Sequence, residues 1–153
     1  MKLTYQDLLE KMTNMEMLAI PPEKGEMGGN FSSYDRNSSY DPSTDTYSLW
    51  GANRDCDGYI RMEKDRLVAF EMEGPGVIWR IWSANPQEGH IRIYTENEQK
   101  EKMDMPFRKL FERYAYDESR VEWPANFPEL MPILSRGRNR FIPIPFNHYC
   151  KVT

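Results

Sequence analysis

The chain has 153 residues and a formal net charge of -4, with 39% hydrophobic and 29% charged residues. This length is enough for one domain with a sizeable core. The negative charge argues against a nucleic-acid partner, since phosphate recognition needs a basic surface. Two cysteines, Cys56 and Cys150, are too few for a disulfide scaffold, and two histidines do not complete a zinc site.

No apolar run approaches the ~20 residues of a membrane span. The first residues lack the apolar core of a secretory signal. We therefore expect no membrane partner, no metal and no cofactor, and a cytoplasmic location for the chain as given. Whether a longer parent protein is exported stays open.

The first predicted element is a helix. Thr4 followed by Asp7 resembles a capping pair, and apolar residues then recur at helical spacing up to Met15. Pro21-Pro22 ends this segment, because proline cannot donate the helical hydrogen bond. We assign residues 1–24 to this helix and a linker, with its apolar face packed on the core or on another subunit.

Residues 25–57 are rich in Gly, Ser, Asn and Asp and show little periodicity. A long irregular stretch inside a compact domain is often functional. Disorder is the alternative interpretation, but disordered segments are poor in aromatic residues. Here aromatic residues are interspersed throughout, namely Phe31, Tyr34, Tyr40, Tyr47 and Trp50.

After Gly58 the pattern changes to short alternating strands, expected over residues 59–63, 67–72, 77–83 and 91–95. Between the second and third, Pro75 presets φ for a tight turn and Gly76 accepts a positive φ after it. Within residues 77–83 we expect Trp79 to lie in the core.

The last third is less regular. Asp104 is expected to cap a short inserted helix over residues 103–114, with Pro106 early in it, followed by a loop over 117–132 that carries Trp123 and Phe127. Residues 141–152 are extended, but prolines 143 and 145 cannot donate to a ladder, which predicts an edge or bulged strand. The strand-like pattern continues to Thr153, so we expect a truncated domain.

These elements predict an all-β fold: an antiparallel β-sandwich with a leading α-helix and a short inserted helix. The domain is expected to span residues 25–153. Its open sheet edge predicts cover from more sequence or from an oligomer partner.

No signature of a nucleophile, phosphate loop or metalloprotease is present, which leaves carboxylate chemistry or plain binding. The candidate carboxylates are Asp35, Asp55, Asp57, Glu71 and Glu73. Glycoside hydrolysis needs two carboxyl groups, one of them with a raised pKa. Spacing does not choose among the five, and for each one a solvated or turn-forming acid is the alternative.

Four residues are candidates for sugar contacts. Asp35-Arg36, in an aromatic loop, could clamp a polyol or orient a neighbouring acid, or simply form a surface ion pair that holds the loop. Trp50 and Trp82 could stack on a sugar ring, or be buried in the core. The basic run Arg136, Arg138 and Arg140 predicts a solvated loop.

Four segments in this order carry a family resemblance. They are Ser33-Tyr34-Asp35-Arg36-Asn37-Ser38-Ser39, Gly74-Pro75-Gly76-Val77-Ile78-Trp79-Arg80-Ile81-Trp82, Ile91-Arg92-Ile93-Tyr94 and Phe141-Ile142-Pro143-Ile144-Pro145-Phe146. The series resembles the start of glycoside hydrolase family 172, whose members are α-D-fructofuranosidases, difructose-anhydride enzymes and α-D-arabinofuranosidases. The resemblance covers almost the whole chain, and the segment from Gly74 to Trp82 is its most specific part.

The resemblance implies a jelly-roll sandwich within a longer, double jelly-roll protomer. It further implies homotrimers or hexamers and retaining hydrolysis of α-D-furanosides by two glutamates without a metal. Those glutamates belong to the part of the family protomer that follows this region, so none is assigned here. Asp35 and Arg36 match a family motif, but the continuation is Asn37-Ser38-Ser39-Tyr40 where the family has Thr-Gly-Gly-Asn. The alternative function is a non-catalytic carbohydrate-binding or oligomerisation module.

Overall fold

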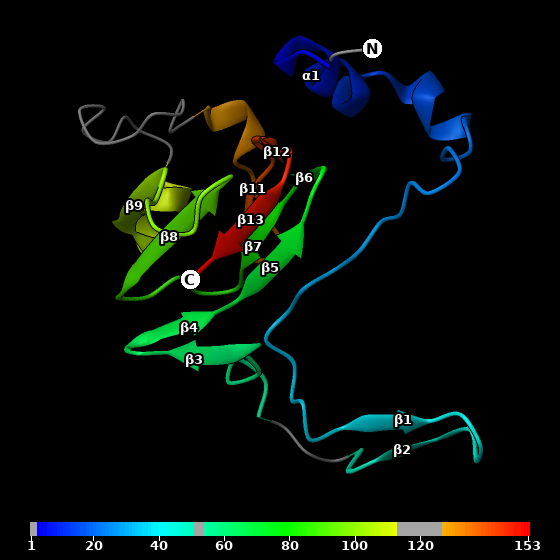
Figure 1. Cartoon of the computed structure of the whole chain (residues 1–153), viewed down its shortest axis with the longest axis vertical. Coiled ribbons are helices and arrows are strands. Elements are labelled where there is room, and N and C mark those ends of the chain that lie inside the picture. Colours follow the sequence, from blue (N-terminus) through cyan, green and yellow to red (C-terminus); the bar gives the residue numbers. More distant parts are fainter. Residues whose placement is uncertain (1–2, 51–53, 113–126) are drawn as a thin grey trace.

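The computed structural model of the 153-residue chain describes residues 3–50, 54–112 and 127–153. Strands dominate these ranges, and a helix precedes them at one end of the molecule (Figure 1). The helical elements are α1 (Tyr5–Thr13), η1 (Met15–Ala19), η2 (Phe107–Phe111) and η4 (Pro128–Leu130). The strands are β1 (Ser39–Asp41), β2 (Thr46–Ser48), β3 (Arg61–Glu63), β4 (Arg66–Val68), β5 (Phe70–Glu73), β6 (Gly76–Ile78), β7 (Ile81–Ser83), β8 (His90–Thr95), β9 (Met103–Pro106), β10 (Ile133–Leu134), β11 (Gly137–Arg140), β12 (Ile144–Phe146) and β13 (Tyr149–Val152).

The leading helix forms as predicted. The backbone N–H of Thr4 donates to the Asp7 carboxylate at 2.6 Å, and the Thr4 hydroxyl accepts from the Asp7 N–H at 3.3 Å. This reciprocal pair satisfies donors that the first helical turn leaves free. Leu8 is buried, and the Tyr5 hydroxyl donates to the carbonyl of Pro143 at 3.1 Å. The helix therefore docks on the sandwich through a small contact.

Two layers enclose the core. One is a four-stranded sheet in the order β5-β13-β8-β9, and the other combines the pair β12-β6 with the three strands β10-β11-β7. Every observed pairing is antiparallel. The core cluster of buried residues comes from both layers and from η2: Ile91, Ile93, Met103, Met105, Leu110, Phe111, Ile144, Phe146, Cys150 and Val152. The antiparallel β-sandwich is confirmed, and its jelly-roll connectivity stays a prediction.

The predicted strand over residues 77–83 is broken in two. β6 pairs with β12, and β7 pairs with β11. Pro143, which has no N–H, lies between β11 and β12 and interrupts the ladder at the same level. Trp79, in the gap between β6 and β7, is 39% exposed, so its predicted place in the core was wrong.

The turn before β6 also differs from the prediction. The Gly74-Pro75 peptide is cis, and Gly76 does not have a positive φ. A Cβ placed on Gly76 would instead overlap the ring of Phe146 on the neighbouring strand. Glycine is needed here because an aromatic ring packs directly on the backbone.

The inserted helix predicted over residues 103–114 was wrong in its first part. Residues 103–106 form strand β9, and a 3-10 turn, η2, follows. The Asp104 carboxylate caps no helix but accepts from Arg92 Nε at 3.0 Å across the sheet. Leu110 and Phe111 are buried as expected. Most of the loop predicted over 117–132, with Trp123, lies outside the described residues, and Phe127 is exposed.

The extended segment 141–152 also forms, but only its first half lies at an edge. β12, with Pro145, pairs only with β6. β13 lies between β5 and β8 in the four-stranded sheet. No proline falls within β13, so its donors remain available on both sides.

Candidate functional site

Asp35 lies at the junction of two loops, residues 31–38 and 54–59. Its Oδ1 accepts from the backbone N–H and the side-chain amide of Asn37, both at 3.0 Å. Its Oδ2 accepts from the N–H of Arg54 at 3.0 Å, and its own N–H donates to Asp55 Oδ1 at 3.0 Å. Asp35 is 5% exposed. The carboxylate therefore ties the two loops together.

Arg36 extends the same junction. Its Nε donates to the carbonyl oxygens of Gly58 at 2.6 Å and Tyr59 at 3.0 Å. Its guanidinium also donates to the Tyr34 hydroxyl at 3.1 Å and lies over the Tyr34 ring, 4.6 Å from the centroid. No salt bridge between Asp35 and Arg36 is among the described ion pairs. Both side chains instead hold the loops mainly through bonds to backbone groups.

The chemistry of Asp35 follows from these bonds. Donation from the Asn37 N–H, supported by Arg54 and the Asn37 amide, keeps the pKa of Asp35 below its usual range despite burial. The carboxyl is then ionised at neutral pH and acts as an acceptor. A general acid in glycoside hydrolysis needs the opposite shift.

Beyond this junction, residues 39–50 form a hairpin that projects away from the sandwich (Figure 1). We call these residues the aromatic arm. Tyr40 and Tyr47 are opposite each other in the register of β1 and β2, with ring centroids 5.1 Å apart, and Trp50 follows 5.4 Å from Tyr47. The three side chains are 49%, 53% and 77% exposed. They form an aromatic row open to solvent, in which neighbouring rings are tilted by 47° and 54° to each other.

Trp82, the other predicted stacking residue, lies elsewhere. It is on β7, 53% exposed, and its indole nitrogen covers the backbone of Gly137 on β11. Among the described residues no ring contact or hydrogen bond joins Trp82 to Trp50 or to the junction of Asp35 and Arg36. Asp35 and Arg36 thus precede the aromatic arm at its junction with residues 54–59, Trp50 contacts Tyr47 within the arm, and Trp82 lies on β7.

Of the other candidate carboxylates, Asp55 and Asp57 also lie at the loop junction. Asp55 accepts from the Asp35 N–H, and Asp57 forms a solvent-exposed ion pair with Arg54 at 3.9 Å. Glu73 is exposed at the end of β5, opposite Tyr149 in the register. These positions are consistent with loop-holding or solvated acids.

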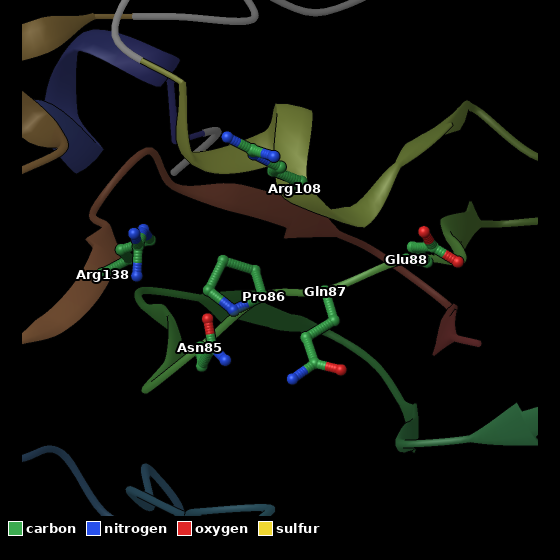
Figure 2. Close-up of a pocket in the computed structure, with 6 residues that line it drawn as sticks. All are labelled: Asn85, Pro86, Gln87, Glu88, Arg108 and Arg138. Atoms are coloured by element: carbon green, nitrogen blue, oxygen red, sulfur yellow. The ribbon is translucent and has the colours of Figure 1, made fainter.

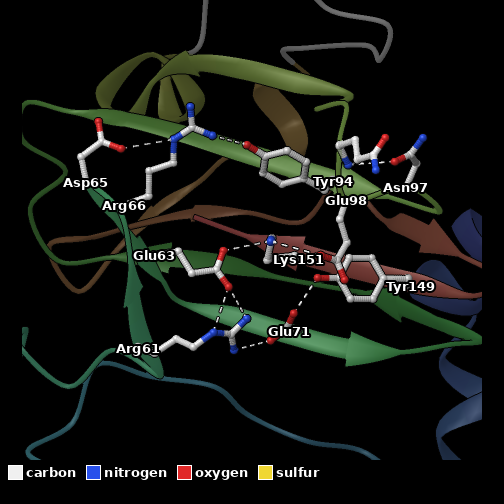
Figure 3. Close-up of polar contacts among 11 residues, drawn as sticks. Arg61, Glu63, Asp65, Arg66, Glu71, Tyr94, Asn97, Glu98, Tyr149 and Lys151 are labelled. Carbon is white, nitrogen blue, oxygen red and sulfur yellow. Dashed lines mark hydrogen bonds and ion pairs between the residues drawn. The ribbon is translucent and has the colours of Figure 1, made fainter.

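Glu71 belongs to a polar cluster on the outer face of the four-stranded sheet (Figure 3). Its carboxylate accepts from Arg61 and, at 2.6 Å, from the Tyr149 hydroxyl. Arg61 also binds Glu63, which accepts from the buried Lys151 at 3.1 Å. The cluster attaches the hairpin of β3 and β4 to the sheet.

This cluster also lacks a general acid. Hydrogen bonds from Arg61 hold the pKa of Glu63 and of Glu71 below the usual range. Burial, together with the bond to Glu71, raises the pKa of Tyr149. Both glutamates are thus ionised and the tyrosine is neutral at physiological pH, a combination suited to holding strands together.

The basic run at residues 136–140 is not the solvated loop that was predicted. Arg136 is exposed in a turn, but Arg138 and Arg140 lie on β11, where Arg138 is half-buried. Arg140 is 1% exposed, its Nη1 donates to the carbonyl of Leu110 at 3.3 Å, and burial lowers its pKa to about 10. Residues two apart on a strand point to the same face, so the deeper burial of Arg140 comes from η2, whose Leu110 carbonyl it contacts.

Cys56 is exposed, Cys150 is buried, and both are free thiols. Within the described ranges, no group of three His, Cys, Asp or Glu side chains is arranged to hold a metal ion. No helix of those ranges is long and apolar enough to cross a membrane.

The geometry defines a β-sandwich domain with a solvent-exposed aromatic arm and carboxylates that hold its loops. A family model described as the GH172 first beta-sandwich domain matches residues 24–153. The chain therefore belongs to glycoside hydrolase family 172 and supplies its first sandwich domain. Searches of the curated proteins and of the solved structures found no match.

Proposed function

We propose that this chain is the sugar-contacting and subunit-contacting jelly-roll sandwich of a retaining α-D-furanosidase, acting on fructofuranosides or arabinofuranosides. The two catalytic glutamates of that enzyme lie outside residues 1–153. The observation that carries the proposal is the aromatic arm with the junction of Asp35 and Arg36 at its base. A glycoside hydrolase domain that presents such a row to solvent has a surface suited to furanose rings.

The carboxylates support the proposal that this chain contacts the sugar but does not supply the catalytic glutamates. The pKa values of Asp35, Glu63 and Glu71 are lowered by the hydrogen bonds that these carboxylates accept, which is opposite to the shift that a general acid requires. We expect the chain alone to release no sugar from aryl α-D-fructofuranoside or α-D-arabinofuranoside, and the complete product of its gene to do so. Release of sugar by the 153-residue chain alone would contradict the proposal that the catalytic glutamates lie outside it.

Two tryptophans make a matched test of the arm. Trp50 and Trp82 are both more than half exposed and lie on different parts of the fold. Binding of fructo- and arabino-oligosaccharides is measured by titration calorimetry for Trp50→Ala and Trp82→Ala. Stacking of a nucleic-acid base on one aromatic ring contributes on the order of 1–3 kcal/mol, and we take a comparable value for a sugar ring. We therefore expect Trp50→Ala to weaken binding about tenfold and Trp82→Ala to change it less than twofold. If both variants and the parent bind the oligosaccharides equally well, the aromatic arm is not the sugar-binding surface.

A non-catalytic carbohydrate-binding module is the second candidate. The exposure of Tyr40, Tyr47 and Trp50 favours it equally, because a binding module needs only the aromatic row. Oligosaccharide binding by the chain, together with no hydrolysis by the complete gene product, would establish this alternative.

The subunit contact is a separate part of the proposal. Met15 and Ile20 beyond α1 are 75% and 65% exposed, and the isolated hairpin β1-β2 is the kind of element that is marginal in water without cover. We therefore expect a homo-oligomer, a trimer or hexamer, which sedimentation of the complete protein tests.

A further inference from the structure

A polar depression of about 370 Å³ lies away from the aromatic arm, where three segments far apart in the sequence meet (Figure 2). Residues 85–88 between β7 and β8 form one side, η2 contributes Arg108, and β11 contributes Arg138. Pro86 is buried beneath it. The depression therefore depends on the tertiary fold and not on one flexible loop.

Neither arginine has a carboxylate partner among the residues that the structure describes. Arg138 Nη1 reaches only the carbonyl of Ala84, at 3.5 Å, and no hydrogen bond or ion pair involves Arg108 within residues 3–50, 54–112 and 127–153. The two acids nearest to Arg108 in sequence are both occupied: Asp104 contacts His90 at 2.6 Å and Arg92 at 3.0 Å, and Glu112 contacts Lys109 at 2.6 Å. Two guanidinium groups thus line one depression with most of their donors unused.

Both arginines project from well-fixed backbone. Arg138 sits on the central strand of β10-β11-β7, opposite Ser83 on one side and Ile133 on the other. Arg108 belongs to η2, whose Leu110 and Phe111 are buried in the core. A fixed backbone removes the cost of ordering a loop on binding, so only the two arginine side chains have to be ordered by the ligand.

The other lining groups are polar and open. The side-chain amides of Asn85 and Gln87 have no hydrogen-bond partner among the described residues, and both are exposed. Figure 2 places Arg138 beside Asn85 at one end of the depression and the single acid, Glu88, at the other end. Arg138 at that end and Arg108 on a separate side, from η2, therefore offer cationic donors, and the remaining lining groups offer amide and carboxylate groups that pair with hydroxyls.

We propose that this depression binds an oxyanion, a carboxylate or phosphate group, carried by a small hydroxylated molecule such as an acidic sugar. The planar guanidinium matches the paired oxygens of carboxylate and phosphate, which a lone ammonium group does not. The amides of Asn85 and Gln87 and the Glu88 carboxylate contact the hydroxyl groups. This site does not depend on the aromatic arm or on the proposed hydrolysis.

The test is a calorimetric titration of the full chain at low ionic strength with four probes: inorganic phosphate, a hexose phosphate, a hexuronate and the neutral hexose. We expect both sugar anions to bind more tightly than phosphate, and added salt to weaken all three anions. Tighter binding of the hexose phosphate would identify phosphate as the group selected, and tighter binding of the hexuronate would identify carboxylate. Binding of the neutral hexose as tight as that of its acidic forms would overturn the proposal.

Variants locate the site. The double variant Arg108→Gln with Arg138→Gln is expected to weaken anion binding at least tenfold. Arg138→Lys should weaken it less, since lysine keeps the positive charge but lacks the planar guanidinium that donates two parallel hydrogen bonds. Lys100→Gln, which removes one exposed positive charge between β8 and β9, is the control and should change binding less than twofold. Circular dichroism confirms that each variant is folded. Anion binding unchanged in the folded double variant, or lost equally in Lys100→Gln, would overturn the proposal.

Discussion

Gly58 provides the strongest test of how the loop junction is built. It is buried, and a Cβ placed on it would overlap the carbonyl oxygen of Tyr34 and lie 2.7 Å from the carbonyl carbon. Both obstacles are backbone atoms, so no side-chain rotation relieves the contact. Gly58→Ala must push residues 32–36 away from residues 54–59.

The cost can be estimated from the contacts that this shift breaks. Forcing a methyl group into packed structure costs roughly 1–3 kcal/mol. Arg36 Nε, which has a single N–H, would also lose the bond that it shares between the carbonyl oxygens of Gly58 and Tyr59, worth about 1 kcal/mol. We expect Gly58→Ala to lower the free energy of unfolding by about 2–4 kcal/mol.

Gly29→Ala is the matched control. No atom lies within 4 Å of a Cβ built on Gly29, and its φ is not positive, so this change should be neutral or stabilise by up to about 0.5–1 kcal/mol. Urea unfolding of both variants, followed by tryptophan fluorescence, measures the difference. If Gly58→Ala is as stable as Gly29→Ala, the two loops are not packed as described.

Two further predictions concern titratable groups. Burial raises the pKa of the Cys150 thiol to about 12. At pH ~8 a thiol reagent should therefore modify the exposed Cys56 quickly and Cys150 only after the protein unfolds. If mass spectrometry shows that both cysteines are labelled at comparable rates in the native protein, β13 is not buried. Hydrogen bonds from Asn37 and Arg54 lower the pKa of Asp35 in the folded chain. The charge of Asp35 therefore stabilises the fold at pH values above the pKa in the unfolded chain, ~3.9. This stabilisation is lost as the pH falls through the pKa of Asp35 in the folded chain. The difference in urea midpoint between the parent and Asp35→Asn should then be constant above pH ~5 and narrow below pH ~4, and a difference independent of pH would show that the charge is irrelevant.

Local features were predictable because their causes lie within a few residues. The helix cap needs only Thr4 and Asp7, and the alternation of Ile91 and Ile93 with Arg92 places a strand with one apolar face. The same holds for the family, since its motifs are contiguous segments of sequence. The match over residues 24–153 agrees with the resemblance seen in those segments.

The roles of individual polar residues were not predictable in this way. The neighbours of Asp35 in sequence make it a candidate sugar ligand, but they do not reveal that its hydrogen-bond donors include Arg54, nineteen positions later. Asp104 has the sequence context of a helix cap, and its partner Arg92 lies on the adjacent strand. A carboxylate in a sequence does not reveal which donors the fold will bring to it.

By itself, the sequence determined the fold class, the leading helix and the family, because these depend on spacing and on contiguous motifs. Only the tertiary structure decided that Arg138 and Arg108 share one depression, that Trp79 is outside the core, and that Tyr40, Tyr47 and Trp50 form one exposed row. The physical reason is strand register: pairing fixes which side chains of distant segments meet, and a shift of one residue would turn each of them to the opposite face.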